Sequence, residues 1–194
     1  MLMVDMRSTV LSEAEKLIRT CGYAGFSYAD IAATVGITKA SIHHYFPTKE
    51  KLVATAIEVY RARYAEAFGQ IETHHSHALD RIDAYGRLYL TGLDQDLGCL
   101  CAALAIERDT LPAGLREATA TFFKDHLDWL ERTYADGLSR GQVSDHLDAA
   151  HAAKLILSVL EGALLIERLL DKRDGFEISL SALRNTLSCV CSRR

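Results

Sequence analysis

The chain has 194 residues, of which 49% are hydrophobic, enough to bury a sizeable core in one or two domains. It holds only two prolines, shows no run of eighteen apolar residues without a charge, and opens without a secretory segment. We therefore expect an all-α, cytoplasmic protein that does not span a membrane. The net charge of −4 excludes a uniformly basic nucleic-acid binder.

The first predicted helix covers residues 5–21. Apolar residues recur on one of its sides and would let shorter helices pack against it. These residues are Val10, Ala14, Leu17, Ile18 and Cys21.

Residues 26–52 read FSYADIAATVGITKASIHHYFPTKEKL and predict two short helices around a glycine turn. Ser27 can cap the first helix, and Asp30 three residues later completes a capping box. Gly36 stands where a helix ends in a left-handed residue, and Thr38 can cap the second helix. This arrangement is typical of a helix-turn-helix, whose second helix enters a DNA major groove.

The outer side of the second short helix carries candidate DNA contacts. Ile42 and Phe46, four residues apart, can anchor the helix inward. Hydroxyls, imidazoles and a lysine can bind phosphate oxygens or base edges, and Ala40 can approach a thymine methyl group. The predicted DNA-binding residues are Ser27, Tyr28, Thr38, Lys39, Ala40, Ser41, His43, His44, Tyr45 and Lys49. The alternative is an interaction module that has the same polar face but does not bind DNA.

The charge distribution agrees in sign with DNA binding. Residues 1–51 contain six Lys or Arg and five Asp or Glu, a balance of +1, so the remainder sums to −5. Because this asymmetry is small, phosphate binding has to rely on local placement, helix N-termini and the symmetry of a dimer.

Longer helices follow. One is predicted over residues 49–71, a length of roughly 35 Å at 1.5 Å per residue. Five more are predicted over residues 78–93, 99–109, 113–139, 149–172 and 177–192, with Asp148 as a cap and breaks at Pro112, Gly141 and Asp174-Gly175. The last two helices carry more apolar residues than one packing face needs, which favours a subunit interface over a monomer core.

The first fifty residues resemble the DNA-binding domain of the TetR family of bacterial transcriptional repressors. The matching segments are residues 14–17, 22–26, 31–32, 35–37, 41–46 and 49–52, although His43, His44 and Tyr45 permute the aromatic triplet usual in the family. The resemblance implies a DNA-binding domain over residues 1–50 and a helical effector-binding and dimerisation domain over residues 51–194. It also implies a homodimer, paired through the last two helices, that binds a double-stranded operator.

The resemblance further implies a small effector between the helices of the second domain, which shifts the dimer to a form that leaves the operator. Aromatic, histidine and cysteine side chains at helical spacing are the candidates, although core packing produces the same pattern. The predicted effector-binding residues are Tyr64, Tyr85, Tyr89, Cys99, Cys101, Phe122, His126 and Trp129.

Cys99 and Cys101 open a predicted helix, where the helix N-terminus favours a thiolate. The Gly-Cys-Leu run resembles a branch of the family that includes sensors of electrophiles and oxidants, and a buried structural thiol is the alternative. A C-x-C pair has too few ligands for structural zinc, so neither a metal nor a cofactor is predicted. The sequence shows no motif for phosphate binding or hydrolysis, and we expect no enzyme. A thiol-dependent enzyme using Cys99 and His126 is the alternative.

Overall fold

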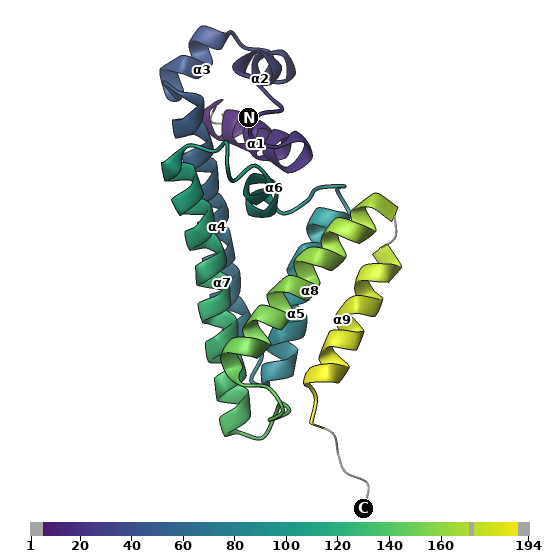
Figure 1. The fold of residues 1–194 in the computed structure, drawn as a ribbon. Coiled ribbons are helices and arrows are strands. Elements are labelled where there is room, and N and C mark those ends of the chain that lie inside the picture. The colour runs from purple at the N-terminus through teal and green to yellow at the C-terminus, as the bar shows by residue number, and fades with distance from the viewer. Residues whose placement is uncertain (1–5, 171–172, 190–194) are drawn as a thin grey trace, which may run out of the picture. The chain divides into compact units, whose positions relative to one another are not determined.

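A computed structural model describes residues 6–170 and 173–189, and this part of the chain forms nine α-helices without a strand (Figure 1). The helices are α1 (Met6–Cys21), α2 (Tyr28–Val35), α3 (Lys39–Tyr45), α4 (Lys49–His74), α5 (Ala78–Leu93), α6 (Leu100–Ile106), α7 (Ala113–Ser139), α8 (Ala149–Leu170) and α9 (Arg173–Leu187). The predicted all-α fold is confirmed.

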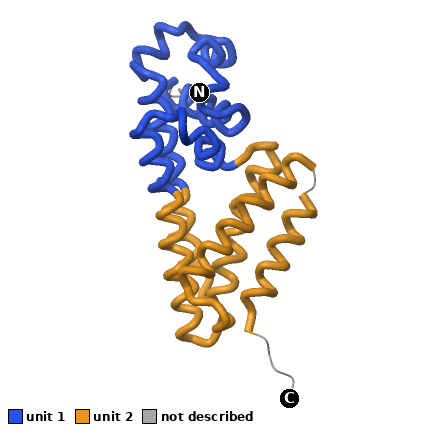
Figure 2. The backbone as a smooth tube through the Cα atoms, viewed as in Figure 1, with its two compact units in different colours: residues 1–63, 99–122 blue, residues 64–98, 123–194 orange. Residues whose placement is uncertain are grey.

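The helices form two compact units, coloured separately in Figure 2. The first unit comprises residues 1–63 and 99–122, and the second comprises residues 64–98 and 123–194. The division differs from the predicted one near residue 50, because α6 packs on α1 and therefore belongs to the first unit. The long helices α4 and α7 each contribute residues to both units.

In the first unit, α1 packs against α2 and α6. Val10, Ala14 and Ile18 are fully buried, as their spacing predicts. The prediction was wrong for Cys21, which is exposed: it is the last residue of α1, where the helix passes into a turn. Glu15 joins α1 to α4, since its carboxylate accepts two hydrogen bonds from the guanidinium of Arg63 (2.8 and 3.1 Å).

In the second unit, α5, α8 and α9 pack against one another. Asp148 caps α8 as predicted, because its carboxylate accepts a hydrogen bond from the amide of His151 (2.8 Å). On α9 four apolar residues spaced three or four positions apart are buried, namely Phe176, Leu180, Leu183 and Leu187. By length and composition α8 is apolar enough to cross a membrane, a test that core helices of soluble proteins also pass, and seven of its residues are buried in the second unit.

The helix boundaries differ from prediction mainly at α6 and α9. The former ends at Ile106 rather than near residue 109, and the latter already begins at Arg173. The break predicted at Asp174 and Gly175 is therefore wrong, because both residues lie in the first turn of α9. Glycine weakens a helix least there, since the amides of a first turn have no partner within the helix. Helix α9 ends at Leu187, and the described residues 188 and 189 are not helical, so the prediction of a helix reaching residue 192 was wrong. The end predicted at residue 172 lies outside the described residues.

Candidate nucleic-acid interface

A capping box closes the start of α2. Ser27 Oγ accepts a hydrogen bond from the Ala29 amide (3.1 Å), and the Asp30 carboxylate accepts from both the Ser27 amide (2.7 Å) and the Ser27 hydroxyl (2.8 Å). These hydrogen bonds from Ser27 hold the pKa of Asp30 below its usual range. The predicted capping box is confirmed, and the side chain of Ser27 is engaged within it.

The turn between α2 and α3 depends on Gly36 and Thr38. Gly36 has a φ of 75°, in the left-handed region that favours glycine, and its amide donates to the Ala32 carbonyl (3.0 Å). Thr38 caps α3, because its Oγ1 accepts a hydrogen bond from the Ser41 amide (3.1 Å). Both local signals that predicted a helix-turn-helix are confirmed.

Helix α3 is held inward at two points. Ile42 is 0% exposed and Phe46 is 1% exposed, as their spacing predicts. Ser41 is half-buried, and its hydroxyl lies 2.9 Å from that of Thr38. The exposed side chains of α3 and its cap are those of Thr38, Lys39, Ala40, His43, His44 and Tyr45. They present hydrogen-bond donors and acceptors and the methyl groups of Thr38 and Ala40 to the surrounding space.

Tyr28 lies beneath this surface rather than on it. Its hydroxyl donates to the Phe46 carbonyl (2.8 Å), and its ring centroid lies 4.7 Å from that of His43. Burial raises the pKa of Tyr28 to about 12. The hydroxyl that sequence reasoning assigned to DNA is therefore engaged with the backbone at the end of α3. Tyr28 supports the candidate interface from inside the unit.

The exposed imidazole of His43 has one ring nitrogen engaged. Its Nδ1 lies 3.2 Å from the Pro47 carbonyl oxygen, which can only accept a hydrogen bond. Nδ1 therefore carries the hydrogen, and Nε2 is the nitrogen left to meet a ligand. A neutral His43 would offer an acceptor at Nε2, and a charged one would offer a donor.

Lys49 does not have the exposed position that the sequence led us to expect. Its ammonium group donates to the Phe26 carbonyl and lies over the rings of Tyr23 (4.7 Å) and Phe26 (4.1 Å). Burial lowers the pKa of Lys49 from its usual range. The periodicity of α4 could not show this, because the partners lie more than twenty residues earlier in the chain.

Sequence reasoning also missed Arg7. Its guanidinium lies over the Phe46 ring, 5.2 Å from the ring centre, so it adds a cationic group beside the end of α3. No local signal pointed to this contact, because the two residues are 39 positions apart and Arg7 belongs to no motif. Basic residues around an exposed helix suit binding to phosphates.

A second group of predicted site residues meets inside the other unit. The Tyr85 hydroxyl lies 2.8 Å from His126 Nδ1 and 3.0 Å from the Tyr89 hydroxyl, which donates to Glu161 (3.3 Å). Burial lowers the pKa of His126 to about 3, so its imidazole stays neutral. The structure thus joins three of the predicted effector residues in one buried hydrogen-bonded chain.

Aromatic rings surround this chain. Tyr64 lies against His126 (ring centroids 4.7 Å apart), and Phe68 stacks on Trp129 (4.8 Å). The indole Nε1 of Trp129 donates to Glu72 (2.8 Å). The cluster contains five of the eight predicted effector residues: Tyr64, Tyr85, Tyr89, His126 and Trp129.

The other three predicted effector residues belong to the first unit. Phe122 lies against Tyr60, with ring centroids 5.4 Å apart. Cys99 occupies the N-cap position of α6 without a capping hydrogen bond from its side chain, and Cys101 follows within that helix. Both cysteines are buried. Their burial limits the access of a reactive compound to either thiol.

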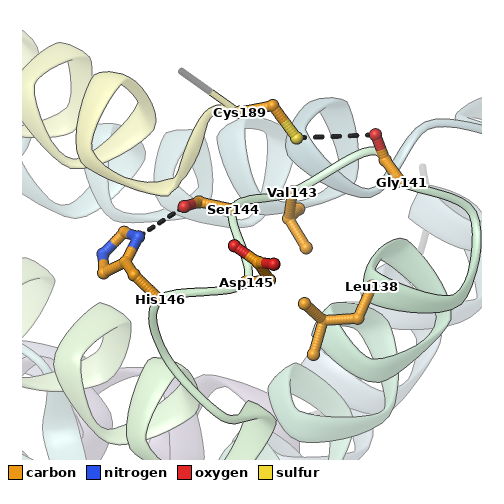
Figure 3. Close-up of a pocket in the computed structure, with 7 residues that line it drawn as sticks. All are labelled: Leu138, Gly141, Val143, Ser144, Asp145, His146 and Cys189. Atoms are coloured by element: carbon orange, nitrogen blue, oxygen red, sulfur yellow. Dashed lines mark hydrogen bonds between the residues drawn. The ribbon is translucent and has the colours of Figure 1, made fainter. Parts of the chain in front are cut away.

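A cavity of about 630 Å³ lies elsewhere in the second unit (Figure 3). Its lining consists of Leu138, Gly141, Val143, Ser144, Asp145, His146 and Cys189. Within it Ser144 is hydrogen-bonded to His146, and the Cys189 thiol donates to the Gly141 carbonyl (3.5 Å). None of the predicted effector residues lines this cavity.

Two family models match the chain. Residues 10–56 match the model of bacterial regulatory proteins of the tetR family, and residues 78–183 match the tetracyclin repressor-like C-terminal domain. The second match alone spans more than half of the chain. The protein belongs to the TetR family. It is accordingly a DNA-binding transcriptional regulator, of a family whose members bind DNA and dimerise.

Solved TetR-family structures resemble the chain over nearly its whole length. A transcriptional regulator from Agrobacterium tumefaciens is 29% identical, with 94% of this chain and 97% of the other covered and a TM-score of 0.90. A TetR regulator from Legionella pneumophila is 28% identical, with 97% and 100% covered and a TM-score of 0.87. Reduced NemR from E. coli is 23% identical, with 96% and 100% covered and a TM-score of 0.82, a likeness of fold alone.

Proposed function

We propose that this TetR-family protein is a homodimeric repressor that binds a near-palindromic operator through α3 and leaves it when a small effector binds. The observation that carries the DNA-binding part is the anchoring of α3. Ile42 and Phe46 are buried while six side chains of α3 and its cap are exposed. A helix presented in this way can enter a major groove. Of the residues assigned to DNA, Lys39, His43, His44 and Tyr45 suit direct contact best.

The dimer is proposed to form through α8 and α9. Large apolar side chains stay exposed near the end of α8 and the start of α9, namely Leu165, Ile166, Leu169, Leu170 and Ile178. An apolar group of this size on two neighbouring helices suits pairing with a second copy. Two α3 helices related by a two-fold axis should then lie one DNA turn apart, about 34–36 Å.

Selection of DNA from a random-sequence duplex pool tests the operator proposal. We expect the protein to enrich a near-palindromic sequence. Lys39→Gln should weaken binding to all sequences and lower its salt dependence, because it removes one phosphate-binding charge. His44→Ala should relax sequence preference instead. If no sequence is enriched, or if neither substitution changes binding, the assignment of α3 is wrong.

The effector is proposed to bind among the buried rings of the second unit. The Tyr85, Tyr89, His126 and Glu161 chain offers hydrogen-bonding groups beside apolar rings, which suits a largely apolar small molecule with one polar group. Trp129 is the only tryptophan of the chain and lies in this cluster, so its fluorescence reports on the site directly.

A compound screen read by Trp129 fluorescence tests this part. A true effector should change the fluorescence and release the selected DNA over the same concentration range. Tyr85→Phe should weaken its binding by about tenfold if the compound depends on the polar chain. The effector site would lie elsewhere if a compound released DNA without changing the fluorescence of Trp129 and released it equally well from the wild type and from the Tyr85→Phe variant.

A further inference from the structure

Glu107, the residue after α6, reaches the turn that leads into the helix-turn-helix. Its Oε2 accepts a hydrogen bond from the Ala24 amide (2.9 Å), across 83 residues of sequence. Its Oε1 lies against Gly22, where a Cβ atom would stand only 1.9 Å away. Both carboxylate oxygens therefore meet the segment between α1 and α2.

Gly22 suits this contact in two ways. Its φ of 76° is left-handed, and its lack of a side chain leaves the space that the Glu107 carboxylate occupies. The Gly22 amide donates to the Ile18 carbonyl (2.9 Å), which ties the turn to α1. The carboxylate thus contacts a backbone whose conformation is already set by the end of α1.

Lys49 holds the other end of the same turn. Its ammonium group donates to the Phe26 carbonyl, one residue before the cap of α2. The charge of Glu107 favours the charged form of Lys49 and, after burial and Glu50, contributes to the raised pKa of Tyr23. The turn at residues 22–26 is therefore held from α4 by a cation and from the end of α6 by an anion.

The backbone of Glu107 is also fixed. Its carbonyl accepts hydrogen bonds from the Thr110 amide (2.9 Å), the Thr110 hydroxyl (3.0 Å) and the Leu111 amide (3.1 Å). These bonds build the connection into α7, which begins at Ala113. Because the backbone of Glu107 is fixed in this way, its side chain holds the Ala24 amide in a defined position.

We propose that Glu107 is a positioning residue for DNA binding, which acts by holding the Gly22–Ala24 backbone and with it the start of α2. The proposal rests on the proposed function, since it concerns the DNA affinity of α3. Glu107 acts through the turn, and loss of its hydrogen bond should populate conformations in which α2 and α3 are misplaced on α1. The apparent DNA affinity falls with the fraction of protein in the competent conformation.

Electrostatics alone predicts the opposite sign. Removal of a carboxylate from a DNA-binding unit makes its charge more positive and should strengthen binding to phosphates. A loss of affinity on removal of Glu107 would therefore point to positioning. Charge and reach can also be separated, because Glu107→Asp keeps the charge but shortens the side chain, whereas Glu107→Gln loses the charge but keeps an acceptor at the same distance.

The experiment measures binding of the full-length variants to the DNA selected from the random pool. We expect Glu107→Asp and Glu107→Ala to bind about tenfold more weakly than the wild type, and Glu107→Gln to stay within about threefold. Amide exchange at Ala24 should quicken by about tenfold in the Asp and Ala variants and much less in the Gln variant. Glu117→Ala, which removes an exposed carboxylate of α7 in the same unit, is the matched control and should bind as well as the wild type or better.

Equal or tighter binding by Glu107→Asp, with unchanged exchange at Ala24, would overturn the proposal. If Glu107→Ala fails to fold, the comparison of the Asp and Gln variants decides the question alone. Failure of the wild type to select any DNA would defeat the proposed function and this inference with it. If the wild type selects DNA but the Glu107 variants do not show the expected differences in affinity, only this inference is wrong and the proposed function stands.

Discussion

At the scale of single residues, Tyr28 supports the exposed helix through one buried hydrogen bond, from its hydroxyl to the Phe46 carbonyl. We expect Tyr28→Phe to lower the free energy of unfolding by about 1–2 kcal/mol, because it leaves a buried acceptor without its donor while the ring is kept. Urea unfolding followed by circular dichroism measures the change. Tyr45→Phe, on an exposed ring, is the control and should stay within about 0.5 kcal/mol. Equal stabilities would show that the Tyr28 bond contributes nothing net.

His126 predicts a pH dependence of stability. Burial lowers its pKa from 6.5 to about 3, so between these values the unfolded chain binds a proton at this residue and the folded chain does not. Stability should therefore fall as pH is lowered through this window, with a slope approaching about 1.4 kcal/mol per pH unit from this residue. The loss is absent above pH 6.5, where the imidazole is neutral in both states.

Comparison with His126→Gln isolates this effect. Glutamine can still form a hydrogen bond with the Tyr85 hydroxyl but does not titrate. The unfolding free energy of the variant should therefore fall less steeply than that of the wild type between pH 6 and 5. The carboxyls of Asp30, Asp80 and Asp148 have pKa values below 3.8 and stay ionised in this range. Parallel stability curves for the two proteins would mean that His126 is accessible to protons in the folded state.

At the scale of elements, the start of α2 depends on the capping box of Ser27 and Asp30. Ser27→Ala removes the side-chain acceptor for the Ala29 amide, a change that typically costs about 1 kcal/mol. We expect amide exchange within residues 28–35 to quicken about fivefold, and operator affinity to fall with it. Hydrogen-exchange mass spectrometry measures this locally. Ser12→Ala on the exposed side of α1 should leave exchange in α2 unchanged, and a general increase across α1 would instead indicate loss of the whole unit.

Elements with local signals were predictable from the sequence. Ser27, Gly36 and Thr38 each act on residues two to four positions away, so the pattern alone located α2, the turn and α3. The contact of Lys49 with the Phe26 carbonyl joins residues 23 positions apart, and the contact of Glu107 with the Ala24 amide joins residues 83 positions apart. Such contacts exist only once the helices have packed, and no periodicity records them.

In the candidate site, too, the residues set by local patterns were predictable and those brought together by packing were not. The exposed residues of α3 follow from two buried anchors four positions apart, which is a helical pattern. The buried chain of Tyr85, Tyr89 and His126 joins α5 and α7, and only their packing selects these residues from the many aromatic and histidine side chains of the sequence. Cys99, Cys101 and Phe122 were grouped with them, yet they belong to the other unit.

At the scale of the whole molecule, the proposed dimer makes operator binding depend on residues far from α3 in the sequence. Leu169 is 86% exposed on α8 and Ile178 is 69% exposed on α9. If these side chains meet a second copy, a carboxylate at either position would be buried in an apolar surface without a partner. We expect Leu169→Glu combined with Ile178→Glu to raise the dimer dissociation constant by about 100-fold.

Sedimentation measures the oligomeric state of this double variant, and titration with the selected DNA measures its affinity. Ile106→Glu is the matched control, because Ile106 is 79% exposed and apolar but lies on α6, outside the proposed interface. It should remain a dimer. Because a dimer contacts both half-sites at once, the double variant should lose most of its preference for the full palindrome over a single half-site, while each α3 keeps its own contacts. A double variant that stays dimeric at the same concentration would move the interface away from the exposed apolar residues of α8 and α9.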